Sequence, residues 1–244
     1  MTYIYRMVID MSDIKYNSLP SLIEEEIIQK ASKLSSAQLA DGMKGLGVIG
    51  DGCMEASILP VSDSMKVIGT ACTVSTNNGD NFPIHVSIYQ GKPGYVLIID
   101  GKGNKEHAYL GDLLTSAAKA VGLNGIVVDG FVRDKGTLID LNYPIFSKGF
   151  MQRGPNKKEP GELNTEINCG GICVQPGDLI VGDYDGITVV PRNMIEIVLE
   201  NAEKKNNYEI ERRKLIEEYN NCKVEGKEVP NLAPQWVNDI KEKL

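Results

Sequence analysis

The sequence has no apolar run as long as the roughly 18–20 residues that a membrane-spanning helix needs. Its N-terminus also lacks the basic segment followed by an apolar stretch that is typical of a secretory signal. Basic residues are outnumbered, 26 to 33, and the resulting net charge of −7 argues against the basic face of a general nucleic-acid binder. We therefore expect a cytoplasmic protein with neither a membrane nor a nucleic acid as its partner.

Cysteine is too sparse and too scattered to form a disulfide framework. The chain has five cysteines in 244 residues, an odd number in a chain long enough to bury a core of its own. Cys169 and Cys173 lie close together, but no second pair and no nearby histidine completes a four-ligand zinc site. We expect free thiols in the core or at strand edges.

Helices and short strands alternate along the chain, which predicts an α/β fold. Residues 18–220 form the expected domain, residues 1–17 an extension before it, and residues 221–244 a tail. Helices are expected from Ser18 to Ala31, from a cap at Ser35 or Ser36, and from Pro191 into a charged second half. Apolar and β-branched runs predict strands at residues 66–75, 95–100, 126–128, 144–147, 170–174, 176–181 and 186–190.

Three connecting segments are also informative. The glycine-rich stretch at residues 45–50 is not a nucleotide-binding fingerprint, because no strand precedes it. Residues 101–107 read as a polar loop that leads into Gly111. The polar stretch at residues 149–168 is long enough to suggest a functional or inter-subunit loop.

The stretch from Gly111 to Asp134 combines a helix and a strand whose ends carry polar residues. Its apolar residues at helical spacing, from Leu113 to Val121, predict a helix that ends at Gly122, where a glycine can take the left-handed conformation. Asp112 then lies at a helix N-terminus, and Arg133 and Asp134 lie just beyond a strand. In an open α/β sheet these two places commonly line one crevice.

The residue types in this crevice suit an anionic oxo-acid and a hard cation. The Leu113 and Leu114 amides and the helix dipole favour a carboxylate, and Arg133 can grip one with two donors. Asp112 and Asp134 offer oxygen ligands of the kind that Mg²⁺ or Mn²⁺ prefers. A simpler interpretation stays open: Asp112 caps its helix, while Arg133 and Asp134 form a surface ion pair and Asp134 caps the next helix.

The two histidines are His85 and His107. A catalytic role is open for His85 more than for His107, although a hydrogen-bonded structural role is the commoner one for such residues. Asp80 and Asn81 either form a turn or line the site, and Asn81 is placed to cap the helix that follows it.

The 111–134 stretch resembles the signature of the class II 4-hydroxy-4-methyl-2-oxoglutarate / 4-carboxy-4-hydroxy-2-oxoadipate aldolases, which share a fold with the regulator of ribonuclease activity A (RraA-like) proteins. Aldolase members carry an aspartate, twenty intervening residues and then Arg-Asp, as Asp112 and Arg133-Asp134 do here. The similarity extends over roughly residues 35–200, through segments 69–74, 79–81, His85, 93–94, 128–130, 176–178 and 183–186. One departure is Thr137, where the family often has an acidic residue.

The resemblance implies an RraA-like swivelling β/β/α domain with a central sheet or barrel and flanking helices. It also implies a lyase that cleaves a 4-hydroxy-2-oxo acid to pyruvate, with oxaloacetate decarboxylation as a related activity. Asp134 would hold the divalent metal (Mg²⁺ or Mn²⁺), with Asp112 orienting its waters. Arg133, with Gly111 and the Leu113 and Leu114 amides, would bind the substrate, and no lysine is placed for a Schiff base.

Related aldolases are homotrimers or hexamers in which an acidic residue of a neighbouring subunit can complete the metal's surroundings. The candidates for that residue are Glu196, Glu200, Glu203 and Glu209. The alternative function is that of a non-catalytic RraA-type regulator that binds a ribonuclease or another protein.

Overall fold

The computed structural model describes residues 15–244, and residues 1–14 of the expected N-terminal extension lie outside the described part. Its helices are α1 (Glu25–Ala31), α2 (Ser36–Met43), α3 (Phe82–Gln90), α4 (Asp112–Val121), α5 (Lys135–Asp140), α6 (Ile195–Glu225) and α7 (Gln235–Lys241). Its strands are β1 (Leu59–Pro60), β2 (Val67–Ser75), β3 (Tyr95–Leu110), β4 (Gly125–Val132), β5 (Ile145–Phe150), β6 (Glu162–Leu163), β7 (Ile167–Cys169), β8 (Ile172–Val174), β9 (Leu179–Asp183) and β10 (Gly186–Val190). The short strands β1, β6 and β7 were not expected.

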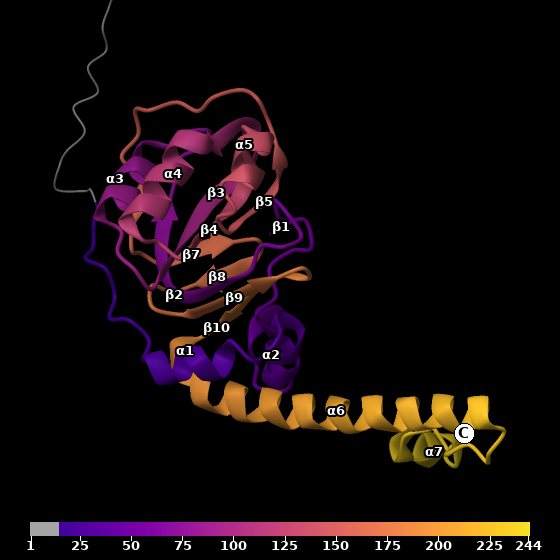
Figure 1. The fold of residues 1–244 in the computed structure, drawn as a ribbon. Coiled ribbons are helices and arrows are strands. Elements are labelled where there is room, and N and C mark those ends of the chain that lie inside the picture. Colours follow the sequence, from indigo (N-terminus) through magenta and orange to yellow (C-terminus); the bar gives the residue numbers. More distant parts are fainter. Residues whose placement is uncertain (1–14) are drawn as a thin grey trace, which may run out of the picture.

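One eight-stranded sheet organises the fold, in the order β1-β5-β4-β3-β2-β9-β10, with β6 paired to β2. Strands β2 to β5 are parallel neighbours, and α3, α4 and α5 are the crossovers between them. The two end strands, β1 and β10, approach each other, so the sheet is nearly closed into a barrel. The predicted α/β fold with a barrel-like sheet and flanking helices is therefore confirmed (Figure 1).

The alternation of side chains along the parallel strands explains why the sheet is buried on both faces. In β3, Leu97 and Ile99 join the core beneath α3, α4 and α5, whereas Val96 and Ile98 point into the barrel interior with Phe146. Successive strand residues face opposite ways, so a continuous apolar run fills two cores at once. A third core lies on the other side of the molecule, where α1, α2 and α6 cover β9 and β10 (Figure 1).

Helix α1 begins later than the expected opening at Ser18. Its first helical residue is Glu25, and the backbone before it is used in tertiary hydrogen bonds. The Ile23 N–H donates to Thr70 Oγ1 (3.0 Å), and the Arg192 guanidinium donates to the carbonyl oxygens of Ser21 (2.6 Å) and Leu22 (3.0 Å). These contacts hold residues 21–23 against the sheet in a non-helical conformation.

The expected loop at residues 101–107 is instead part of β3. Strand β3 continues to Leu110, and β4 continues past Asp129-Gly130 to Val132, with three register shifts between them after Ile99. Bulges of this kind let two strands stay paired while absorbing extra residues. The polar composition of residues 101–107 therefore marks an irregular strand rather than the end of one.

Helix α6 runs from Ile195 to Glu225, after a short 3-10 turn at Arg192–Met194. Its buried residues end at Ala202, but Gln38 of α2 still donates to Glu209 (3.0 Å). Beyond α2 the helix projects from the body, with α7 beside it (Figure 1). Residues 221–225 of the expected tail are thus helical. Among residues 15–244, no helix is both long and apolar enough to cross a bilayer.

Asp183, at the end of β9, ties the barrel to the start of α2. Its buried carboxylate accepts hydrogen bonds from Ser36 N (2.9 Å), from Ser36 Oγ (2.6 Å) and from Asp185 N (3.1 Å). The predicted cap of α2 is confirmed at Ser35, which forms a capping box with Gln38.

We expect Asp183→Ala to lower the free energy of unfolding by about 1–3 kcal/mol, because it leaves buried donors without their charged acceptor. Urea unfolding would measure the change. Asp185→Ala is the matched control, since the Asp185 side chain is exposed, and it should change stability far less. Equal effects from the two variants would contradict a structural role for the Asp183 carboxylate.

Candidate active site

The strands β3 and β4 end side by side, and this brings the two halves of the candidate site together. Leu110 and Val132, the last residues of the two strands, are paired, and Arg133 N donates to Leu110 O (3.0 Å). Because the strands are parallel, the residues that follow each of them leave the sheet at the same edge. Gly111-Asp112 and Arg133-Asp134 therefore lie next to each other.

Helix α4 follows β3 directly and is confirmed at Asp112–Val121, with Gly122 in the left-handed conformation at its end (φ 89°). The N-cap position belongs to Gly111, so Asp112 does not cap the helix by occupying that position. The expectation that the Leu113 amide is free is wrong, because its N–H donates to Asp112 Oδ1 (2.7 Å). Leu114 N–H donates to no atom of residues 15–244 and remains available to a ligand.

Asp134 is held in an unusual conformation that directs its carboxylate back toward α4. Its backbone is left-handed (φ 63°), which costs a non-glycine residue about 1 kcal/mol or more. It occupies the N-cap position of α5 without capping it, so the expected side-chain cap is not formed. Instead Oδ2 accepts from Asp112 N (3.3 Å) and lies 3.4 Å from Arg133 Nε. The expected ion pair between Arg133 and Asp134 is present.

Gly111 provides the space that this carboxylate occupies. A Cβ atom at this position would lie 2.1 Å from Asp134 Oδ2 and 2.9 Å from Arg133 Cγ. Gly111 itself is extended (φ −144°), so the requirement is for space and not for an unusual backbone angle. Any side chain here would displace the Asp134 carboxylate from the helix N-terminus.

A small cleft of about 100 Å³ opens between α3, the start of α4 and the loop around residues 155–157. Its lining residues are Asn81, His85, Tyr109, Leu110, Gly111, Asp112, Leu113, Leu114, Arg133, Pro155 and Lys157. The sequence did not identify Pro155 and Lys157 as site residues, although the length of their polar stretch suggested a functional loop. Leu113 is 80% exposed and forms an apolar part of the rim of the cleft.

The donor set fits a hard divalent cation. Asp112 and Asp134 offer carboxylate oxygens at one helix N-terminus, and Gly111 keeps the space for the second of them clear. Within residues 15–244 no cluster of three or more acidic, cysteine or histidine side chains forms a complete metal cage. One or two carboxylates with several waters is the usual protein environment of Mg²⁺.

The four glutamates belong to α6, which packs with α1 and α2. These helices lie on the opposite side of the molecule from α3 and α4, which border the cleft (Figure 1). Glu200 pairs with Lys204 (2.6 Å), and Glu209 pairs with Arg213 (3.1 Å). Glu196, Glu200 and Glu203 line a groove beside α1 instead. Within one chain, none of the four lines the cleft.

Asp80, Asn81 and His85, at the start of α3, differ in whether their polar atoms have hydrogen-bond partners. Asp80 serves the turn, because its carboxylate accepts from Phe82 N (2.9 Å), Lys158 N (2.8 Å) and Glu159 N (3.2 Å). The expected cap of α3 by the Asn81 side chain is not formed. The Asn81 amide instead donates to Tyr109 O (2.9 Å). Asn81 Oδ1 and His85 Nε2 are buried without a hydrogen-bond partner in the described chain.

Burial, with a smaller contribution from the Lys157 ammonium, lowers the pKa of His85 below its usual value. His107 does not line the cleft, and its ring lies close to Gly79.

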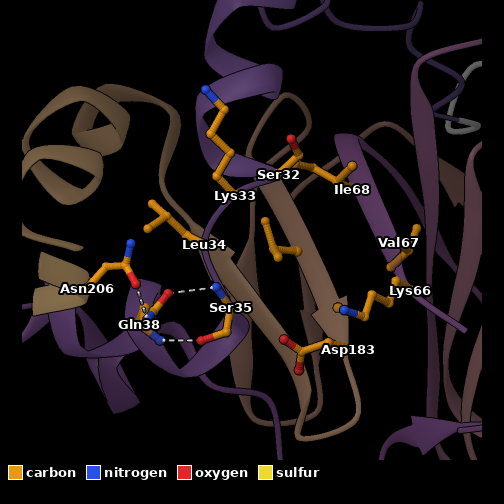
Figure 2. Close-up of a pocket in the computed structure, with 12 residues that line it drawn as sticks. Ser32, Lys33, Leu34, Ser35, Gln38, Lys66, Val67, Ile68, Asp183 and Asn206 are labelled. Atoms are coloured by element: carbon orange, nitrogen blue, oxygen red, sulfur yellow. Dashed lines mark hydrogen bonds between the residues drawn. The ribbon is translucent and has the colours of Figure 1, made fainter. Parts of the chain in front are cut away.

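A larger hollow, of about 460 Å³, lies elsewhere, between the α1–α2 connection, β2, β9 and α6 (Figure 2). Several of its polar groups already bind one another: Ser35 and Gln38 exchange hydrogen bonds, and Gln38 also donates to Asn206 (3.0 Å). Asp183 is occupied by Ser36. The smaller cleft is the better candidate, because Asn81 Oδ1, His85 Nε2 and the Leu114 N–H, all from its lining residues, have no hydrogen-bond partner within residues 15–244.

Comparisons with known proteins agree with this geometry. Residues 36–189 match a family model described as RraA-like, Aldolase/RraA. A protein of Halalkalibacterium halodurans named "Putative 4-hydroxy-4-methyl-2-oxoglutarate aldolase" is 37% identical over 185 residues, which cover 76% of this chain and 86% of that protein. An uncharacterised protein of Pseudomonas syringae has a solved structure with a TM-score of 0.72 and 28% identity, covering 87% of this chain and 98% of that one.

A third relative is Streptomyces coelicolor RraAS2, described as an unusual member of the RNase ES inhibitor RraA protein family. Its crystal structure matches with a TM-score of 0.71 and 26% identity, over 78% of this chain and 98% of that chain.

Proposed function

The chain belongs to the RraA-like (Aldolase/RraA) family, and from this we propose that it is a divalent-metal-dependent aldolase that cleaves a 4-hydroxy-2-oxo acid to pyruvate. Oxaloacetate decarboxylation is proposed as a second activity, because it passes through the same pyruvate enolate. The observation that carries the proposal is the convergence of Asp112, Arg133 and Asp134 at the N-terminus of α4. The name of the H. halodurans relative supports the aldolase branch of the family.

Substrate binding follows from the groups that remain free in the cleft. The Arg133 guanidinium, 42% exposed, can bind the carboxylate and keto oxygens of the pyruvate half with two parallel donors. The Leu114 N–H and the positive end of the α4 dipole add attraction for the same negative charge. Arg133 also stabilises the enolate that develops when the bond breaks.

Asp134, with Asp112 acting through water, would hold the Mg²⁺ or Mn²⁺ ion. When bound there, the ion would supply Lewis-acid stabilisation of negative charge without a covalent Schiff base. Asp134 needs its strained backbone and the Gly111 space for this role, because both place its carboxylate beside the Asp112 amide.

We further propose that the protein assembles as a homotrimer or a hexamer. The chain itself places the Asp112 carboxylate in the lining of the cleft and the Asp134 carboxylate beside the Asp112 amide, and the α6 glutamates lie on the other side of the molecule. An acidic residue reaching the site would then have to come from a neighbouring subunit.

We expect pyruvate release from 4-hydroxy-4-methyl-2-oxoglutarate and from oxaloacetate in the presence of Mg²⁺ or Mn²⁺. Release should disappear with a chelator and return when metal is added in excess. A coupled pyruvate assay would measure both reactions, with free metal alone as the background.

A folded protein with no turnover above that background would contradict the aldolase proposal. It would favour the alternative of a non-catalytic regulator, to which the similarity with the S. coelicolor RraA-family protein points. A screen for a ribonuclease or other protein partner would then be the next measurement.

A further inference from the structure

The wall of the cleft that faces the start of α4 comes from the beginning of α3. Asn81 precedes the helix and His85 lies in its first turn, with His85 N donating to Asn81 O (3.2 Å). The Asn81 side-chain amide is anchored on Tyr109 O, next to the end of β3. His85 and Asn81 are therefore fixed relative to Arg133 and Asp112, which line the same cleft.

Two polar atoms of this wall are not satisfied by the protein. Asn81 is 3% exposed, and its Oδ1 has no partner within residues 15–244; the same holds for His85 Nε2. Leaving a buried polar atom without a hydrogen bond costs about 1–3 kcal/mol. Two such atoms beside one small cleft indicate a wall that is completed by a polar group of a ligand.

The protonation state of His85 suits a base. Desolvation lowers its pKa, and the Lys157 ammonium, which also lines the cleft, acts in the same direction. Arg133 is a further cation in the cleft and Asp112 an anion, while the Tyr89 ring lies 6.3 Å from the imidazole. A lowered pKa favours the neutral imidazole, and in its Nδ1–H tautomer Nε2 carries a free lone pair.

We infer that His85 is the proton acceptor for the 4-hydroxyl group of the substrate during aldol cleavage. This inference rests on the proposed function. The hydroxyl proton moves to His85 Nε2, and the O–H electron pair forms the C4=O bond. The C3–C4 bond breaks, and its electron pair becomes the enolate of pyruvate, which takes a proton from water at C3. The imidazolium returns its proton to solvent.

The two proposed activities separate this role from a structural one. Oxaloacetate has no 4-hydroxyl group, so its decarboxylation needs no proton acceptor at that position. For His85→Gln we expect the ratio of aldol cleavage to decarboxylation to fall about 10²–10⁴-fold, the usual contribution of a general base. The acid limb of the pH profile of aldol cleavage should also disappear in the variant.

His107→Gln is the matched control, because His107 does not line the cleft, and its activity ratio should equal that of the wild type. Equal loss of both activities in His85→Gln, or no loss of either, would overturn the role of His85. Wild-type protein inactive on both substrates would overturn the proposed function itself, and this inference with it.

Discussion

Replacement of Asp134 by alanine should reduce metal-dependent pyruvate release by more than about 100-fold, since even outer-shell partners of a metal contribute 10–100-fold. Its carboxylate is the group that the fold places beside the Asp112 amide, in the space kept by Gly111. The variant should also lose Mn²⁺ binding, which titration calorimetry would measure without any substrate.

Two further variants make this test specific. Asp134→Asn keeps the shape of the side chain and an oxygen for the Asp112 amide but removes the charge, so it should also lose metal binding. Asp140→Ala removes an exposed carboxylate at the other end of α5 and should behave as the wild type. Retention of Mn²⁺ affinity in both Asp134 variants would show that the metal is held elsewhere.

Much of the fold was predictable because the local patterns are strong. The apolar stripe and Gly122 predicted α4 with its end, and the β-branched runs predicted β2, the first half of β3 and β9. In β3 the continuous run is required by two cores, one on each face, so its composition and its burial agree.

The extension of β3 through residues 101–110 was not predictable from composition. Its pairing with β4 passes through three register shifts, and these depend on contacts such as that of Asn104 with Gly130 rather than on local propensity. The non-helical backbone at residues 21–23 was missed for a similar reason, because Thr70 and Arg192, far away in the sequence, hold it.

In the candidate site, too, some features could be predicted from the sequence and others depend on the folded structure. The spacing from Asp112 to Arg133-Asp134 predicted that these residues meet, and the structure brings them together at the ends of β3 and β4. The engagement of the Leu113 amide by Asp112 and the left-handed backbone of Asp134 follow from the detailed geometry of the turn. The roles of these residues in catalysis stay predictions.

The conformation of Asp134 beside Gly111 indicates a functional role for this turn. A left-handed aspartate is costly, and a cap at α5 would be the ordinary way to repay that cost, yet no such hydrogen bond forms. The carboxylate is instead partly exposed and shares its Oδ2 between the Asp112 amide and Arg133. Strain without a stabilising cap is more typical of a functional site than of a structural turn.

Arg133→Lys should lower kcat/KM for pyruvate release by about 10²–10³-fold, the usual cost of losing a donor that stabilises developing negative charge. Lysine keeps the positive charge but offers a single compact ammonium in place of a planar two-donor fork. If Arg133 acts mainly on the enolate, the loss should be in kcat; if it only binds the carboxylate, the loss should be in KM.

Stability should hardly change in this variant, because the Arg133 side chain is 42% exposed and its ion pair with Asp134 is a surface contact. Arg153→Lys provides the control: Arg153 is exposed, pairs loosely with Glu106 (4.0 Å) and does not line the cleft. Unchanged kcat/KM in Arg133→Lys, with steady-state kinetics on both substrates, would mean that charge alone is needed at this position. Arg133→Ala would then decide the matter, because full activity in that variant would remove Arg133 from the substrate site altogether.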